Sequence, residues 1–256
     1  MNETIEYYNR HAKSFCDSTV MADMSLCRRR FLQYIPKGGR ILDAGCGSGR
    51  DSRAFLEAGY RVEAFDASEA VCQYARTYTG LPVRCCRFED FAEHFGASGS
   101  AAFGLLDTGV LRESDDICGS GGFGEPGAGA LREGTAVDRA AAMGENAGFD
   151  GIWACASLLH LPEKSLTVVL PMLAGALKRS GILYASFKRG QNQHFRGGRF
   201  FCDFTEDSLT KLISQSHCFK LLECFVTGDV RADREGELWV NIIARTMTGA
   251  ECNELK

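Results

Sequence analysis

The chain has 256 residues, of which 45% are hydrophobic and 24% are charged, and its net charge is -4. This composition is typical of one sizeable globular domain, and no apolar run approaches the roughly 20 residues that a membrane-spanning helix requires. The acidic balance disfavours a broad phosphate-binding face, so we do not expect nucleic acid as the partner.

The N-terminus and the cysteines indicate the compartment. The segment MNETIEYYNR carries acidic and aromatic residues where a signal peptide would carry a basic and then an apolar stretch, which predicts a cytoplasmic protein. Twelve cysteines are scattered through the chain, as Cys155 is within the apolar segment WACASLLHL. This pattern predicts reduced core thiols, with no disulfide framework and no metal site.

The first 35 residues have the pattern of a helical cap. Apolar residues recur at helical spacing between Thr4 and Ile35, and Pro36 then stops the pattern. We expect two helices here, packed on the part of the chain that follows.

Beyond the cap, short apolar runs alternate with helical patterns, which predicts a parallel sheet. Residues 219–230 and 237–246 should close the sheet with an antiparallel edge hairpin. The expected fold is a Rossmann-like three-layer α/β sandwich with about seven strands, most of them parallel. The other predicted strands cover residues 40–45, 61–68, 82–91 (a strand with its exit loop), 149–157 and 181–187, and the predicted helices cover 52–59, 69–80, 166–181 and 205–216.

Residues 94–148 interrupt this alternation. Gly and Ala dominate the segment, which therefore buries too little apolar surface to offset the entropy of ordering. We predict a disordered insertion within one domain that spans residues 1–256. A second folded module, a functional lid and a partner-docking segment are the alternatives.

The main chemical motif is DAGCGSG, residues 43–49, at the exit of the first strand, with Asp66 at the exit of the second. Glycines let the backbone approach a ligand closely, and the second acid can accept hydrogen bonds from ribose hydroxyls. A dinucleotide site favours the spacing GxGxxG, whereas this chain has GxGxG. Asp43 would repel a pyrophosphate but suits the cationic methionine end of S-adenosylmethionine.

The segments ILDAGCGSGRDS, AFDAS and FDGIWACASLLHLP, in this order, resemble the class I S-adenosylmethionine-dependent methyltransferases. The resemblance is strongest to the bacterial small-molecule group that includes tellurite-resistance-like and ubiquinone-biosynthesis-like enzymes. It implies S-adenosylmethionine as cofactor, a small-molecule acceptor, and a monomer or homodimer. Carried over by position, the cofactor-binding residues are Asp43, Gly45, Cys46, Gly47, Gly49, Asp66, Ala67, Phe88, Glu89, Ala154 and Leu159.

Methyl transfer from a sulfonium is an in-line displacement, for which the protein mostly supplies alignment and desolvation. A base is needed only when the accepting oxygen or nitrogen carries a proton. His160, after the fourth strand, is the candidate catalytic base, and the alternative is that it merely lines the pocket.

By the same resemblance, the acceptor lies between the N-terminal helices and the loop after the fifth strand, residues 188–204. The loop could clamp an anionic acceptor, or it could simply be solvated. The tyrosine pair of the cap could instead pack the cap against the core. The candidate acceptor residues are Tyr7, Tyr8, His11, Lys188, Arg196 and Arg199.

Missing motifs exclude two nucleic-acid chemistries. The fourth strand leads into Ala154-Cys155-Ala156-Ser157 rather than an Asn/Asp-Pro-Pro-Tyr/Phe motif, and no proline precedes a cysteine. An RNA-modifying methyltransferase of another type, a nicotinamide-dependent dehydrogenase and a non-catalytic S-adenosylmethionine-binding protein remain as alternatives.

Overall fold

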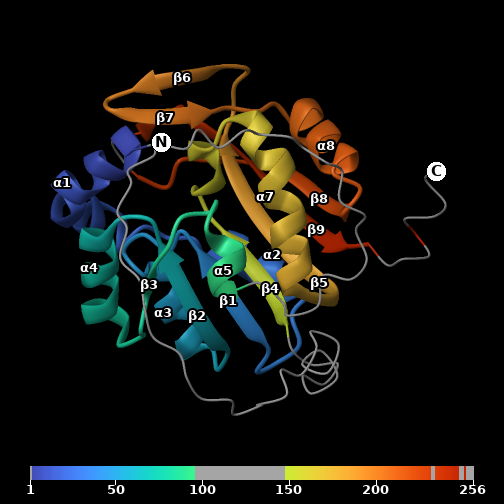
Figure 1. Cartoon of the computed structure of the whole chain (residues 1–256), viewed down its shortest axis with the longest axis horizontal. Coiled ribbons are helices and arrows are strands. Elements are labelled where there is room, and N and C mark those ends of the chain that lie inside the picture. Colours follow the sequence, from blue (N-terminus) through green and yellow to red (C-terminus); the bar gives the residue numbers. More distant parts are fainter. Residues whose placement is uncertain (1, 96–147, 232–233, 248–250, 252–256) are drawn as a thin grey trace, which may run out of the picture. The chain divides into compact units, whose positions relative to one another are not determined.

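The computed structural model describes residues 2–95, 148–231, 234–247 and 251 (Figure 1). Most of the predicted insertion, residues 96–147, lies outside the described residues. The residues just before it form a short helix, α5 (Phe91–Phe95).

A seven-stranded sheet forms the centre of the described part, in the order β3-β2-β1-β4-β5-β9-β8. Strands β3, β2, β1, β4 and β5 run parallel, whereas β9 pairs antiparallel with both β5 and β8. The predicted α/β class, the mostly parallel sheet and the reversed edge hairpin are therefore confirmed. The strands are β1 (Arg40–Ala44), β2 (Arg61–Asp66), β3 (Arg84–Cys85), β4 (Phe149–Ala154), β5 (Leu177–Lys188), β8 (Phe219–Gly228) and β9 (Leu238–Thr246).

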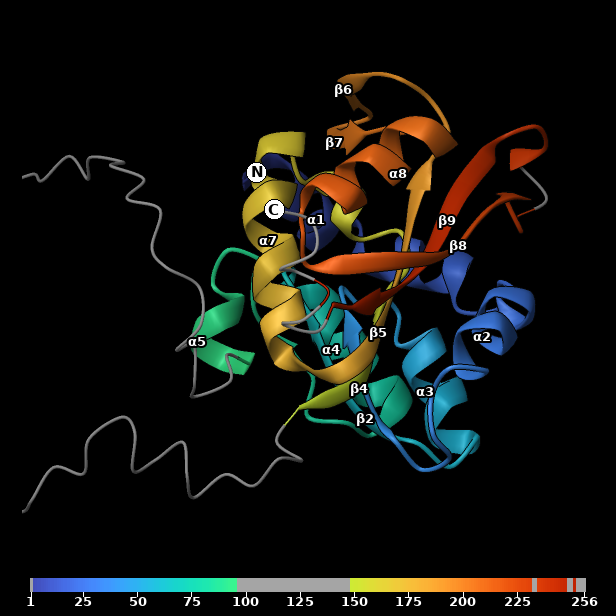
Figure 2. The same ribbon diagram turned by 90° about the vertical axis from the view of Figure 1, so that its right-hand side faces the viewer.

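Helices cover both faces of this sheet (Figure 2). The apolar side chains of α5, α7 and α8 pack on one face, against Leu42 and Ile152. On the opposite face, α2 and α3 pack against Ile41 and Trp153, and α4 packs against Ala64. The helices are α1 (Asn2–Thr19), α2 (Ser25–Leu32), α3 (Arg50–Glu57), α4 (Glu69–Thr79), α7 (Glu163–Ala176) and α8 (Glu206–Gln215), with a 3-10 turn, η1 (Leu158–His160).

The third strand and the helix after the fourth strand have other bounds than expected. Residues 82–91 were expected to hold the third strand and its exit loop, but β3 has only two residues, because the chain leaves the sheet early and turns where the Asp90 N–H donates to the Arg87 carbonyl. The helix expected over 166–181 ends at Ala176, because Leu177 already pairs with Phe149 of β4.

The segment interpreted as a flexible loop, residues 188–204, contains a second small sheet. Strands β6 (Gln193–Arg196) and β7 (Arg199–Cys202) pair antiparallel. The two residues between them, Gly197 and Gly198, have φ values of 57° and 76°. Positive φ at both positions is what a tight two-residue hairpin turn requires, and glycine adopts it without steric cost.

The order of the strands positions the functional site. Going outward from the centre, the chain runs β1, β2, β3 on one side and β4, β5 on the other, so the winding reverses between β1 and β4. Open α/β sheets bind ligands in the crevice beyond the carboxyl ends of the strands at such a point. None of the helices in the described ranges is long and apolar enough to cross a membrane.

Candidate functional site

The glycine turn after β1 holds a left-handed backbone at the edge of the crevice. Gly45 has a φ of 76° and Gly47 a φ of 55°, and the N–H of Gly45 donates to the carbonyl of Phe65 at 2.9 Å. A Cβ on Gly45 would lie 2.4 Å from the Cβ of Ser157. Glycine is thus required here by the backbone conformation and by space, and the bare turn faces the crevice.

Asp66, the last residue of β2, orders this turn. One carboxylate oxygen accepts from the Gly47 N–H at 3.0 Å and the other accepts from the Ser68 N–H at 3.0 Å. Burial raises the pKa of Asp66, and these backbone hydrogen bonds oppose the rise. A carboxylate has about four lone-pair sites, so Asp66 keeps the capacity to accept hydrogen bonds from a ligand.

Asp43 is a buried carboxyl group beneath the same crevice. It accepts a hydrogen bond from the Ser52 hydroxyl of α3 at 2.6 Å. Burial, together with the charge of Asp51, raises the pKa of Asp43 to about 7. A cationic ligand group nearby would favour the ionised form.

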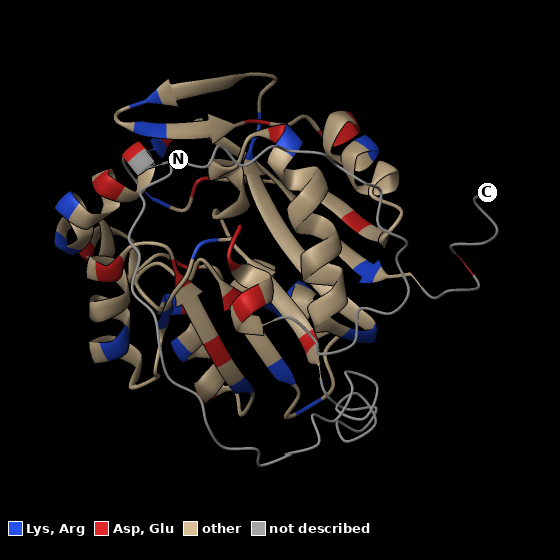
Figure 3. Ribbon diagram, in the orientation of Figure 1, with Lys and Arg blue, Asp and Glu red and all other residues tan. Residues whose placement is uncertain are grey.

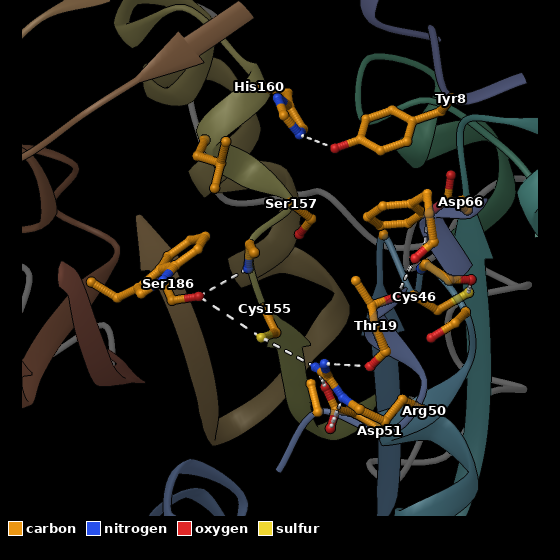
Figure 4. Close-up of a pocket in the computed structure, with 18 of the residues that line it drawn as sticks. Tyr8, Thr19, Cys46, Arg50, Asp51, Asp66, Cys155, Ser157, His160 and Ser186 are labelled. Atoms are coloured by element: carbon orange, nitrogen blue, oxygen red, sulfur yellow. Dashed lines mark hydrogen bonds and ion pairs between the residues drawn. The ribbon is translucent and has the colours of Figure 1, made fainter. Parts of the chain in front are cut away.

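Asp51, in the first turn of α3, forms a buried cluster that the sequence did not reveal (Figure 4). Its carboxylate binds Arg28 at 2.6 Å and Arg50 at 2.6 Å, and it accepts from the indole N–H of Trp153 at 3.1 Å. Arg50 also reaches the Thr19 carbonyl at 3.3 Å. The cluster joins α1, α2, α3 and β4 along one wall of the crevice.

Tyr8 and His160 form the opposite wall (Figure 4). The Tyr8 oxygen lies 2.9 Å from Nε2 of His160, and Nδ1 of His160 lies 2.6 Å from the Phe200 carbonyl. A carbonyl can only accept, so Nδ1 carries the proton and Nε2 accepts from the Tyr8 hydroxyl. Burial lowers the pKa of His160 to about 4, which keeps the ring neutral at physiological pH.

The basic residues of segment 188–204 differ in their pairing. Lys188 binds Asp229 at 3.1 Å and also contacts Glu237. Arg196 lies 3.9 Å from Glu237. Arg199 contacts aromatic rings instead, and within the described ranges it forms no ion pair with a carboxylate.

These groups line one cavity of about 440 Å³. It reaches from the glycine turn and Asp66, past His160, to the β6–β7 hairpin and the start of β9. The predicted residues that line it are Tyr8, Asp43, Gly45, Cys46, Gly47, Asp66, Ala67, Phe88, Glu89, Leu159, His160, Lys188, Arg196 and Arg199.

Four predicted residues do not line this cavity. A Cβ on Gly49 would lie 2.6 Å from Thr79, so this glycine lets α3 pack against α4. Ala154 is buried within β4. The exposed His11 bonds the Tyr7 carbonyl through its ring, and Tyr7 stacks on the His11 ring outside the cavity.

The sequence analysis missed several lining residues, among them Cys155, Ser186 and Asn241. Cys155 and Ser186 follow the expected rule that strand ends face the crevice, since they lie at the carboxyl ends of β4 and β5. Asn241 lies in β9, which reaches the crevice only through its antiparallel pairing with β5, and no local sequence pattern signals that approach.

One group in the described ranges has the composition of a metal site. Ligand atoms of Glu69, Cys72 and Cys85 lie within 4.8 Å of one another. The Cys72 thiol already donates to the carbonyls of Asp66 and Arg84, and Glu69 pairs with Arg76. These internal bonds account for the side chains without an ion.

Comparison with known proteins identifies the family to which this fold and site belong. The sequence matches a methyltransferase domain family over residues 10–213. No curated protein matches the sequence.

Solved structures of low sequence identity share the fold. A Burkholderia thailandensis 1,6-didemethyltoxoflavin-N1-methyltransferase, crystallised with 1,6-didemethyltoxoflavin and S-adenosylhomocysteine, is 17% identical, with a TM-score of 0.62 over 96% of this chain and 87% of that one. A Methanosarcina mazei S-adenosylmethionine-dependent methyltransferase is 18% identical, with a TM-score of 0.54 over 89% and 99%. A Corynebacterium glutamicum TehB-like methyltransferase is 16% identical, with a TM-score of 0.52 over 95% and 98%.

The family match covers most of the chain, and the fold agrees with it. The chain therefore belongs to the methyltransferase domain family, as a class I S-adenosylmethionine-dependent methyltransferase.

Proposed function

We propose that this enzyme methylates a small molecule that binds in the same cavity as the cofactor. The observation that carries the proposal is the continuity of this cavity from the glycine turn and Asp66 to His160 and the β6–β7 hairpin. Its volume of about 440 Å³ lies within the range of small-molecule sites. The Burkholderia enzyme, crystallised with 1,6-didemethyltoxoflavin and S-adenosylhomocysteine, supports the same assignment.

The cofactor half of the cavity is the part that β1, β2 and their exit loops form. We assign the ribose to Asp66, the methionine end to Asp43 and the turn at Gly45, and the adenine to the loop that carries Phe88 and Glu89. S-adenosylmethionine, when bound, supplies the activated methyl group and its leaving group. The protein contributes position and exclusion of water.

The Tyr8–His160 pair stands at the acceptor side. Because Nε2 of His160 already accepts from Tyr8, a proton from the acceptor could reach the ring only through the tyrosine oxygen. A pKa near 4 also makes His160 a weak base at neutral pH. We therefore assign His160 to hold the Tyr8 hydroxyl, whose oxygen can in turn accept a hydrogen bond from an O–H or N–H of the acceptor.

Isothermal titration with S-adenosylmethionine, S-adenosylhomocysteine and NAD tests the cofactor assignment. The wild type should bind both sulfur nucleosides and not NAD. Asp66→Asn should weaken them by roughly tenfold or more, because hydrogen bonds to a charged group contribute about 1.5–3 kcal/mol. Glu57→Gln, on the exposed end of α3, is the matched amide control and should bind like the wild type.

Turnover then tests the acceptor. Radiolabelled methyl donor is incubated with the protein and a library of small hydroxy and amino compounds, and with bulk RNA. Label in a small product, lost in Tyr8→Phe, supports the assignment. Label in RNA alone would contradict it, and NAD binding in place of the sulfur nucleosides would contradict the cofactor itself.

A further inference from the structure

Arg199 occupies a special position among the cations of the cavity. It is the first residue of β7, directly after the Gly197-Gly198 turn. Basic residues, coloured blue, lie at the end of the β6–β7 hairpin that faces α1 (Figure 3). The centres of the Tyr7, Tyr8 and Phe201 rings lie 4.6, 5.8 and 5.3 Å from its guanidinium carbon. Aromatic faces attract a guanidinium and fix its plane, so the group is already oriented before a ligand arrives.

Its charge has no counter-ion in the described part of the chain. Lys188 and Arg196 have Asp229 and Glu237 nearby, whereas Arg199 has no carboxylate within ion-pair distance. Its Nε atom is buried and has no hydrogen-bond partner within the described ranges. A half-buried cation without an anionic partner is unfavourable, and an anion that enters the cavity beside it would relieve this cost.

The surroundings of Arg199 also belong to the acceptor side. Tyr8, whose ring it contacts, bonds His160, and Phe201 lines the same cavity. Burial raises the pKa of Tyr8, and the charge of Arg199 and a hydrogen bond from its side chain oppose this rise. An acceptor held here meets the Arg199 cation and the rings of Tyr8 and Phe201, which line the cavity beside it.

We propose that Arg199 binds a carboxylate of the methyl acceptor, which is accordingly an anionic molecule with a flat apolar body. The guanidinium is a planar fork that matches the two oxygens of a carboxylate, which favours this anion over a single point charge. The same cation disfavours amine acceptors by charge repulsion. This proposal rests on the proposed function and specifies its substrate class.

Paired probes test it on the full-length protein saturated with S-adenosylhomocysteine. Benzoate and 4-hydroxybenzoate are titrated against benzamide and 4-hydroxybenzamide, which have the same shape without the charge. The wild type should prefer the carboxylates by about tenfold or more. Arg199→Gln should abolish the preference, and Arg199→Lys should retain part of it because the charge remains without the fork. Arg189→Gln, which removes an exposed arginine paired with Glu206, should leave the preference intact.

Measuring the affinity for S-adenosylhomocysteine separates a failure of the Arg199 proposal from a failure of the proposed function. Arg199→Gln should bind S-adenosylhomocysteine as the wild type does. If wild-type protein does not bind S-adenosylhomocysteine, the proposed function fails. If it binds but shows no carboxylate preference, or if the preference survives in Arg199→Gln, only the role of Arg199 is overturned. Loss of cofactor affinity in Arg199→Gln overturns it as well, because Arg199 would then hold the carboxylate of the cofactor.

Discussion

At the scale of single residues, Asp43 couples cofactor binding to pH. In the free protein its pKa is about 7, because burial and the Asp51 charge favour the protonated form. The cofactor carries a cationic amino group, and its binding near Asp43 would favour the ionised form and expel the proton. Affinity for S-adenosylhomocysteine should then be constant between about pH 7 and the pKa of the cofactor's amino group, and should fall as the pH drops below 7, by at most about tenfold per pH unit.

Calorimetry in buffers with different ionisation enthalpies measures this proton directly. At pH 7 the wild type should release about half a proton on binding S-adenosylhomocysteine. Asp43→Asn keeps the acceptor oxygen for Ser52 but cannot ionise, so it should bind more weakly and release no such proton. A release that persists in Asp43→Asn would assign the linkage to another group.

At the scale of elements, the β6–β7 hairpin forms the cover of the acceptor side. Its backbone forms hydrogen bonds with α1 and with η1. The Phe200 N–H donates to the Thr4 hydroxyl of α1 at 3.0 Å, and the Phe200 carbonyl accepts from His160. A Cβ on Gly198 would lie 3.1 Å from the Tyr7 ring. The turn, the cap helix and the Tyr8–His160 pair therefore depend on one another.

Gly198→Ala should loosen this cover. The substitution places a side chain at a φ of 76° and against Tyr7, and a left-handed conformation costs a non-glycine residue about 1–2 kcal/mol. Hydrogen exchange of the β6–β7 amides should accelerate by roughly tenfold, with unchanged affinity for S-adenosylhomocysteine. Gly59→Ala is the matched control, because Gly59 has a φ of 85° and no atom within 4 Å of its would-be Cβ. Equal acceleration of the hairpin amides in both variants would contradict the specific link to Tyr7.

The elements differ in how far the sequence could predict them. The strand-turn-helix unit around Gly45 was predictable because its apolar run, glycines and helical pattern all lie within some twenty residues. The hairpin was missed although Gly197-Gly198 is a hairpin turn signal, because the residues before the turn, QNQHFR, lack the alternation of a half-buried strand. Most of these residues form β6, which pairs with β7 in a small separate sheet, and contacts of β7 with α1 and η1 favour this conformation.

The residues of the candidate site also differ in how far the sequence could predict them. Asp43 and Asp66 follow from their places at the ends of neighbouring strands, and both line the cavity. The separation of Arg199 from Lys188 and Arg196 was beyond the sequence, since it depends on where Asp229 and Glu237 of the edge hairpin lie.

At the scale of the whole molecule, Asp51 connects the cap to the sheet. Arg28 comes from α2, Arg50 and Asp51 from α3, and Trp153 from β4. The Asp51 side chain is 5% exposed and that of Arg28 is 19% exposed, so water screens the pair weakly. Removing one partner from such a cluster leaves buried charge uncompensated, which costs about 3–5 kcal/mol.

Asp51→Asn should therefore lower the free energy of unfolding by about this amount, measured by urea denaturation followed by circular dichroism. Glu57→Gln makes the same chemical change on the same helix, at an exposed pair with Arg53, and should leave the free energy of unfolding nearly unchanged.

The dependence of stability on pH tests the same cluster in a second way. Burial alone would raise the pKa of Asp51, but Arg50 and Arg28 hold it below its usual value. The stabilisation is then fully present above the unfolded pKa near 4 and is lost as the pH falls through the lower folded value. The difference between wild type and Asp51→Asn should accordingly shrink in acid, and a difference that stays constant down to pH 3 would mean that packing, not the charge of Asp51, holds the cap against the sheet.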